Sequence, residues 1–429
     1  MPSRNELPTV LSASEIVPVM ESVVAKIQST LDHIVETVSP SNACFNNVMK
    51  PWADVDNEVQ TEQGMIWLLM YASPDQQTHD QIAKAAQLFN KASTQWSSRA
   101  DLFKLVKAVA EKDENLDPES RHYAKDKLQD FVKAGHGSFD ENGIREYLEL
   151  GRKVEELTKK YNKNLVDKRG GAWFSEEDEL QGISAAEINT WQKGTGEHQG
   201  CRYIPFANGG RRRAVLTSAT NPATREKLYL GDDSSVPDNI GLFRDVILLR
   251  DERARMLGFE NHADFRIKSR AIQSVDYVQN FLSELEQSLV PRGKMEIEKL
   301  QNMRIQDRKE LGVWQEGDNL TFPPWDLNYY QAKLKAEVGV NEKDVTPFFP
   351  LDTTISGMLH LFESFLGIKF KRIPDSELTP ETIWHKDVQV WETYKDDAFI
   401  GNLYLDLLAR ERKYKGSQNV NIHCVSCGN

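Results

Sequence analysis

The chain has 429 residues, of which 39% are hydrophobic and 28% are charged, and its formal net charge is -12 at pH 7. This balance disfavours a nucleic-acid-binding protein, because neutralising phosphates requires clustered Lys and Arg, and no apolar run approaches the roughly 20 residues that span a membrane. We therefore expect a globular protein that binds neither nucleic acid nor membrane, with two or three domains on the usual prior of about 150 residues each.

The N-terminal third is predicted to be helical. Its first residues lack the apolar core of a secretory signal and include an early Glu6, so a cytoplasmic location is expected. From Ser14 to Val38, apolar residues recur every three or four positions, which indicates a long amphipathic helix. A second helix is expected over residues 46–69, a third capped by Ser73, and another that begins at Asp117-Pro118.

The clearest helical pattern lies between residues 147 and 165. Its apolar members are Tyr147, Leu150, Val154, Leu157, Tyr161 and Leu165. Steps of three and four residues indicate a helix that packs lengthwise against another helix. Because Gly170-Gly171 ends the pattern early, packing within the chain is favoured over an oligomerising coiled coil.

The pattern changes between residues 180 and 230. Tyr203–Phe206, the turn signal Asn208-Gly209-Gly210 and Arg213–Leu216 together predict a short β-hairpin. Helices are expected to resume with Asn221 as an N-cap and to continue from Ile240 to Leu257.

The C-terminal part is predicted to be helical until two strands appear near its end. A long charged helix is expected from Val275 to Leu311, and shorter helices are expected to begin near Trp325 and at Asp352. Two adjacent strands are predicted at Asp387–Tyr394 and Phe399–Leu407. The fold class is therefore mainly α, with a small β-hairpin and a small β element near the C-terminus.

Seven stretches in chain order resemble one known family. They are Phe45–Val48, Ser73–Asp75, Thr224–Tyr229, Arg250–Phe265, Pro324–Tyr330, Val345–Leu351 and the strand pair that leads to Tyr414. Together they cover residues 40–422 and resemble the zinc metallopeptidases of the thimet oligopeptidase, saccharolysin and neurolysin family, peptidase family M3. The resemblance implies a two-lobed helical oligopeptidase fold around a deep channel, in which one zinc ion serves to hydrolyse short peptides.

The resemblance also implies how the chain is organised. We expect an N-terminal helical lobe at residues 1–180, a hairpin-containing insertion and connection at 181–235, and the first part of the catalytic lobe at 236–429. In this family the final strands pack against the zinc-helix region, so we expect the following residues to lose part of their cover: Val388, Val390, Leu403, Leu405 and Leu407.

The zinc helix itself is not expected in these residues. It needs two His one helical turn apart with a Glu beside the first, H-E-x-x-H, and none of the nine His begins that pattern. We therefore assign no catalytic, cofactor-binding or metal residue, and expect a chain that is truncated before the zinc helix and inactive alone. Two alternatives remain open: a non-catalytic peptide- or partner-binding protein, and a premature end to the sequence of an active enzyme.

Three histidines are weighed against structural roles. His423 lies in the run His423-Cys424-Val425-Ser426-Cys427, which offers three soft ligands where a structural zinc site needs four, so an unconstrained tail is favoured over metal or redox chemistry. His262 is interpreted as a hydrogen-bonded residue that positions a turn. His385, beside Trp384, is a candidate for a position near the channel, although a structural role is favoured.

The remaining charged clusters also favour structural roles. Glu155-Glu156 and Glu176-Glu177 are interpreted as solvated carboxylates and not as an acid pair for catalysis. The basic run Arg211–Arg213 is interpreted as a solvated strand edge and not as an anion or nucleic-acid site. With four Cys in the chain, no disulfide framework is expected.

Overall fold

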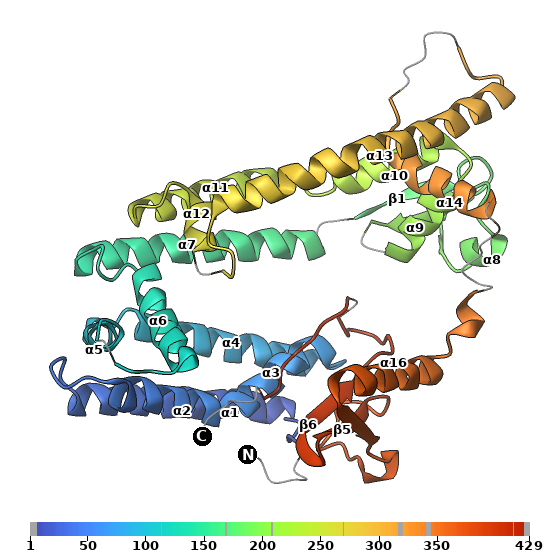
Figure 1. The fold of residues 1–429 in the computed structure, drawn as a ribbon. Coiled ribbons are helices and arrows are strands. Elements are labelled where there is room, and N and C mark those ends of the chain that lie inside the picture. Colours follow the sequence, from blue (N-terminus) through green and yellow to red (C-terminus); the bar gives the residue numbers. More distant parts are fainter. Residues whose placement is uncertain are drawn as a thin grey trace. The chain divides into compact units, whose positions relative to one another are not determined.

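The computed structural model describes residues 7–112, 114–167, 170–206, 209–268, 270–315, 321–337, 339, 345–414 and 416–423. These residues are mainly helical, which confirms the predicted fold class (Figure 1). The chain divides into two compact units, one formed by residues 1–144 with 350–429 and the other by residues 145–349. The sequence-based proposal divides the chain into three consecutive segments. The structural units differ from these segments, because residues 350–429 belong to the same unit as the N-terminal helices.

The first unit begins with a helical bundle. Its helices are α1 (Ala13–Thr37), α2 (Lys50–Glu58), α3 (Gln60–Ala72), α4 (Gln76–Ser97), α5 (Ala100–Ala110) and α6 (Pro118–Lys133). The predicted stripe of α1 is confirmed, since Ile16, Val23 and Leu31 on one face are each at most 2% exposed. At its start, the backbone N–H of Ser12 donates to Glu15 Oε2 (2.8 Å), which satisfies one of the helix's free donors.

The predicted second helix is not continuous. A single π-helical turn at Phe45–Met49 precedes α2, and α2 is separated from α3 by Val59. The N–H of Val59 bonds back to the carbonyls of Asn57 and Val55, which tightens the last turn of α2 before α3 begins. The periodic apolar pattern runs through this bend, so the pattern alone could not reveal it.

Two N-caps were predicted in this bundle, and one of them is wrong by two residues. Asp117 caps α6 as predicted, because its side chain accepts from the N–H groups of Glu119 and Ser120. Helix α4 is capped by Asp75 and not by Ser73, since Asp75 Oδ2 accepts the N–H of Thr78 at 2.7 Å. A carboxylate is favoured at this position because it also carries the charge that stabilises a helix N-terminus.

The C-terminal part of this unit is a three-stranded antiparallel sheet with a helix beside it (Figure 1). The elements are α16 (Leu351–Leu366), β4 (Ile368–Arg372), β5 (Gln389–Lys395) and β6 (Ala398–Leu405). The predicted strand pair is confirmed as β5 and β6, whereas β4 was not foreseen. Helix α16 begins at Leu351, one residue before the predicted start at Asp352, and ends at Gly367, which adopts the left-handed conformation (φ 63°).

The expected loss of cover over these strands is only partly found. Val388 and Val390 are 2% and 0% exposed, so that expectation is wrong for both. Leu403 and Leu405 of β6 are half-buried, and Leu407, which lies just after β6, is 52% exposed, as expected. The two valines are buried because the sheet packs within the first unit.

The second unit joins long helices to a small sheet. Its elements are α7 (Glu141–Asp167), which begins just before the unit, β1 (Gly171–Ser175), α8 (Ala185–Ile188), β2 (Gln192–Lys193), β3 (Cys201–Pro205), α9 (Gly209–Ser218), α10 (Pro222–Asp233), α11 (Asp238–Met256), α12 (His262–Ile267), α13 (Val275–Glu310) and α14 (Leu327–Glu337). The predicted helix at 147–165 is confirmed within α7, and the one at 275–311 is confirmed as α13. Asn221 caps α10 as predicted, through its side chain and the N–H of Ala223 (3.0 Å).

The predicted hairpin is wrong in its second strand. Residues Arg213–Leu216 lie in α9, whereas β3 pairs with β1 and β2. Val215 and Leu216 are almost fully buried in a core that also contains Phe174 and Ile204 from the sheet. Burial of α9 against this sheet therefore outweighs the local turn signal.

A buried ion network joins three parts of the second unit. Arg225 on α10 and Asp326, just before α14, form an ion pair of 2.6 Å whose side chains are each 1% exposed. Arg304 of α13 donates to the other carboxylate oxygen of Asp326 at 3.0 Å. Arg225 also lies over the ring of Tyr329, 4.1 Å from its centroid. A single carboxylate thus holds together the segments that contain these two arginines.

Candidate functional site

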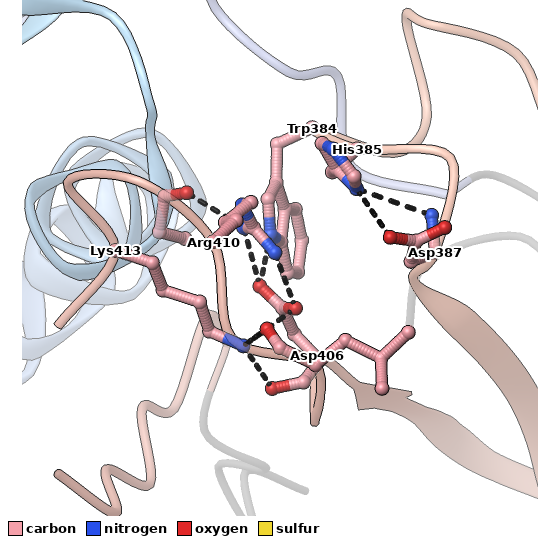
Figure 2. Close-up of polar contacts among 8 residues, drawn as sticks. Trp384, His385, Asp387, Asp406, Arg410 and Lys413 are labelled. Atoms are coloured by element: carbon pink, nitrogen blue, oxygen red, sulfur yellow. Dashed lines mark hydrogen bonds and ion pairs between the residues drawn. The ribbon is translucent and has the colours of Figure 1, made fainter. Parts of the chain in front are cut away.

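The segment that resembles the approach to the zinc helix is built around the carboxylate of Asp406, directly after β6 (Figure 2). Arg410 donates to both carboxylate oxygens at 2.7 Å. Lys413 Nζ donates to Oδ1 at 2.8 Å, and the indole N–H of Trp384 donates to Oδ2 at 2.8 Å. The side chains of Asp406, Arg410 and Lys413 are only 11–14% exposed. This carboxylate is therefore fully engaged by protein donors.

The electrostatics of the cluster keep Asp406 ionised. Burial by itself would raise the pKa of this carboxyl, but the hydrogen bonds from Arg410, Lys413 and Trp384 outweigh burial and lower its pKa to about 2. A general base needs a pKa nearer to the working pH and a free lone pair that faces the substrate. Asp406 meets neither condition, so its role is to organise the chain.

The segment beyond the cluster runs antiparallel to α3. Arg410 donates to the carbonyl of Ala72 at 2.6 Å, and the N–H of Tyr414 donates to the carbonyl of Tyr71 at 2.9 Å. The rings of Tyr71 and Tyr414 meet edge to face, with centroids 5.6 Å apart. Further along, Ile422 packs against the core of the helical bundle. The cluster therefore fixes the strand pair and this segment to the N-terminal helices.

His423 and its neighbouring cysteines were the one predicted cluster of soft ligands. The Nδ1 atom of His423 lies 2.8 Å from the hydroxyl of Thr61 on α3, and the side chain is exposed. Cys424 and Cys427 lie outside the described residues. Within the described ranges, three or more His, Cys, Asp or Glu side chains nowhere gather into a group that could hold a metal ion.

His262 and His385 occupy different surroundings. His262 is the first residue of α12, and its ring lies 6.0 Å from that of Phe265, whereas its Nδ1 is buried and has no hydrogen-bond partner among the described residues, so the expected hydrogen-bonded role in the turn stays a prediction. Burial, together with the nearby cations of Arg250 and Arg266, lowers the pKa of His262. His385 is half-buried and accepts the N–H of Asp387 at Nδ1 (3.3 Å), close to the Asp406 cluster (Figure 2). Its place near a peptide channel stays a prediction.

The charged clusters have structural partners. Glu156 is exposed and paired with Arg152 on the same helix at 2.9 Å, and Glu176 is paired with the buried Arg202 at 2.8 Å. The interpretation of Arg211–Arg213 as a strand edge is wrong, because these residues lie in α9, where Arg212 pairs with Asp232 at 2.8 Å.

The sequence reading missed the Asp406 cluster as a centre of structure. The signal that could have found it is the closeness in sequence of one acid, Asp406, to two bases, Arg410 and Lys413, in a segment that forms neither helix nor strand. The partner carbonyl at Ala72 lies 338 residues earlier in the chain. No local pattern could reveal that partner.

A catalytic zinc ion would need ligands that the described residues do not gather in one place. A catalytic site needs three protein ligands and an open position for water. The described residues provide no such set, and the full sequence contains no H-E-x-x-H.

Among the described helices, none combines the length and apolar character that crossing a membrane requires.

Comparison with known proteins gives a consistent result. Residues 215–427 match the family model described as Peptidase family M3. The chain is 29% identical to oligopeptidase PhomG of Diaporthe leptostromiformis, with 82% of this chain and 50% of that protein covered. It is 26% identical to saccharolysin of Saccharomyces cerevisiae, with 90% of the chain and 55% of the relative covered. For oligopeptidase A of Escherichia coli strain K12 the identity is 26%, with coverage of 94% and 59%. The chain thus spans about half the length of these relatives.

Proposed function

Because this chain belongs to peptidase family M3, we propose that it carries the peptide-handling scaffold of a zinc oligopeptidase that acts on short peptides. We further propose that these 429 residues do not form the zinc site and do not hydrolyse peptides alone. The expected cytoplasmic location belongs to the same proposal.

One observation carries the second half of this proposal. Zinc-dependent hydrolysis requires ligands for the metal and a base for its bound water, and none of the nine His begins an H-E-x-x-H sequence. The geometry supports the same conclusion, because the carboxylate of Asp406, beside the strand pair, already accepts hydrogen bonds from Arg410, Lys413 and Trp384. Its four charge-assisted contacts bind chain segments together and leave no open ligand position.

A peptide-cleavage assay tests this proposal. The purified 429-residue chain is incubated with zinc and a series of internally quenched fluorescent peptides, with and without 1,10-phenanthroline, and saccharolysin serves as the positive control. We expect no chelator-sensitive cleavage by the chain. Cleavage that the chelator abolishes would overturn the proposed inactivity.

The same peptides distinguish the alternative role as a non-catalytic binding protein. In an equilibrium titration, that alternative requires saturable binding of an oligopeptide without any product. If neither binding nor cleavage occurs, the scaffold alone has no peptide function, and the first half of the proposal fails as well.

A further inference from the structure

Helix α13 carries apolar side chains that the described residues leave exposed. Residues 281–292 are exposed on every side of the helix. The large apolar side chains of α13 that are 40–70% exposed are Tyr277, Phe281, Leu282, Leu285, Leu289, Val290, Met295 and Ile297. Helices in proteins gain most of their stability by packing an apolar face, and a contiguous exposed apolar surface marks an interaction site. This stretch of α13 is therefore suited to a partner.

One face of α13 has a symmetric pattern centred on Ser288. Phe281 and Met295 lie seven residues before and after Ser288, and seven residues make almost two full turns. Tyr277 and Lys299 lie eleven residues before and after it, and eleven residues make about three turns. All five side chains thus lie within about 20° of one line along the helix, and all five are exposed.

The same face carries opposite charges at equal distances from its centre. Glu284 lies four residues before Ser288, and Arg292 lies four residues after it. The two are about 12 Å apart along one helix, which is too far for a close ion pair within the chain. Arg292 Nε donates to Glu296 at 3.1 Å, and the Arg292 side chain is 82% exposed, so its guanidinium is accessible to a partner.

This pattern is complementary to itself when two copies of α13 run antiparallel. A two-fold axis at Ser288 places each residue opposite the one at the same distance on the other side of Ser288. The acid Glu284 then meets the base Arg292 of the other copy, whereas a parallel pair in register would place Glu284 against Glu284. Like charges at a contact disfavour the parallel arrangement. The charges on this face therefore select an antiparallel second copy.

The apolar residues of the face match in the same arrangement. Phe281 meets Met295, and an aromatic ring and a thioether attract each other. Tyr277 meets Lys299, whose ammonium group can lie over the ring. The small side chain of Ser288 lies at the axis and permits close approach of the two helices. Each of these contacts occurs twice in the pair, except the one at Ser288.

We propose that α13 packs antiparallel against α13 of a second copy of this chain, about a two-fold axis at Ser288. The face spans about 33 Å from Tyr277 to Lys299. A single pair of helices is a small interface, so the dimer is reversible. This inference does not rest on the proposed function, because it requires neither zinc nor bound peptide.

Sedimentation velocity of the purified 429-residue chain tests the inference. We expect the wild-type chain to pass from monomer to dimer between about 1 and 100 μM, as a small interface predicts. Glu284→Arg replaces two attractive contacts in each dimer by two repulsive ones. Its dimer dissociation constant is therefore expected to rise about tenfold or more.

Two further variants make the comparison specific. Glu286→Arg is the matched control, because Glu286 is also exposed but lies about 160° around the helix from Ser288. Its dissociation constant is expected to change by less than about threefold. The double variant Glu284→Arg with Arg292→Glu restores opposite charges across the axis, so it is expected to recover most of the affinity that Glu284→Arg loses.

Three results would overturn the inference. They are a wild-type chain that stays monomeric up to about 1 mM, equal dissociation constants for Glu284→Arg and Glu286→Arg, and a double variant that is no tighter than Glu284→Arg alone. Circular dichroism and thermal unfolding of each variant show whether its fold is kept. The proposed lack of cleavage would survive any of these outcomes, because sedimentation does not test hydrolysis.

Discussion

Gly64 in α3 lies so close to the carbonyl oxygen of Ile422 that a Cβ atom at residue 64 would collide with it. Glycine in a helix interior costs up to about 1 kcal/mol relative to alanine, and here it permits the C-terminal segment to cross α3. The other end of this segment is fixed to α3 by two hydrogen bonds. The Arg410 side chain donates to the carbonyl of Ala72, and the N–H of Tyr414 donates to the carbonyl of Tyr71.

Substitution of Gly64 by alanine is expected to loosen this crossing. Although alanine favours the helix, the collision with backbone atoms should give a net loss of about 1–3 kcal/mol in the free energy of unfolding, measured by urea denaturation. Gly357 in α16 is the matched control, because a Cβ there meets open space. Gly357→Ala should stabilise by up to about 1 kcal/mol. Equal stabilisation by both substitutions would show that Ile422 does not lie against α3.

Substitution of Asp406 by asparagine is expected to destabilise the first unit. The change leaves the largely buried Arg410 and Lys413 without their anion, at a cost of about 2–4 kcal/mol in urea denaturation. Asp397→Asn provides the control, because the pair between Asp397 and Lys369 is exposed and should contribute less than about 1 kcal/mol. Similar values for both variants would mean that Asp406 does not organise the segment.

The pH dependence of stability gives an independent test of the same cluster. Because the pKa of Asp406 is lowered to about 2 in the fold, from an ordinary value of 3.8, the unfolded chain binds its proton more readily. Its contribution is therefore complete above pH 3.8 and is lost as the pH falls toward 2. The stability difference between the wild type and Asp406→Asn should narrow by about 2 kcal/mol over that window. A difference that stays constant would contradict the lowered pKa.

Disruption of the buried ion network in the second unit is expected to reduce the free energy of unfolding more than Asp406→Asn does. Asp326→Asn removes the charge that compensates Arg225, which is 1% exposed, and Arg304, so we expect a loss of about 3–5 kcal/mol in the free energy of unfolding. The control Asp245→Asn affects an exposed pair with Arg244 and should change stability by less than about 1 kcal/mol. If Asp326→Asn is as mild as its control, the network does not tie these segments together.

The sequence predicted the elements whose signals are local. Helix α6 follows from Asp117-Pro118, and α1 follows from its apolar stripe, because a cap or a periodic face is written in adjacent residues. The strand predicted at Arg213–Leu216 failed because β3 finds its partner in β1, some thirty residues earlier, which no turn signal specifies. Strand β4 carries Lys369, Lys371 and Arg372, a composition that is not typical of a strand.

The candidate site was less predictable than the fold. The family resemblance located the strands before Asp406, but the contacts of Arg410 and Ile422 with α3 join residues more than three hundred positions apart. The bend at Val59 between α2 and α3 is likewise not marked by the apolar pattern. Such sites arise from tertiary packing, and local spacing alone does not contain them.

The zinc content of the purified chain tests the central claim most directly. After saturation with zinc and dialysis, elemental analysis is performed on the wild-type chain and on the double variant Cys424→Ser with Cys427→Ser, which removes the terminal thiols. We predict below about 0.1 zinc ion per chain in the double variant, because three protein ligands do not converge elsewhere in the described residues. About one zinc ion per chain in that variant, released by 1,10-phenanthroline, would contradict the account.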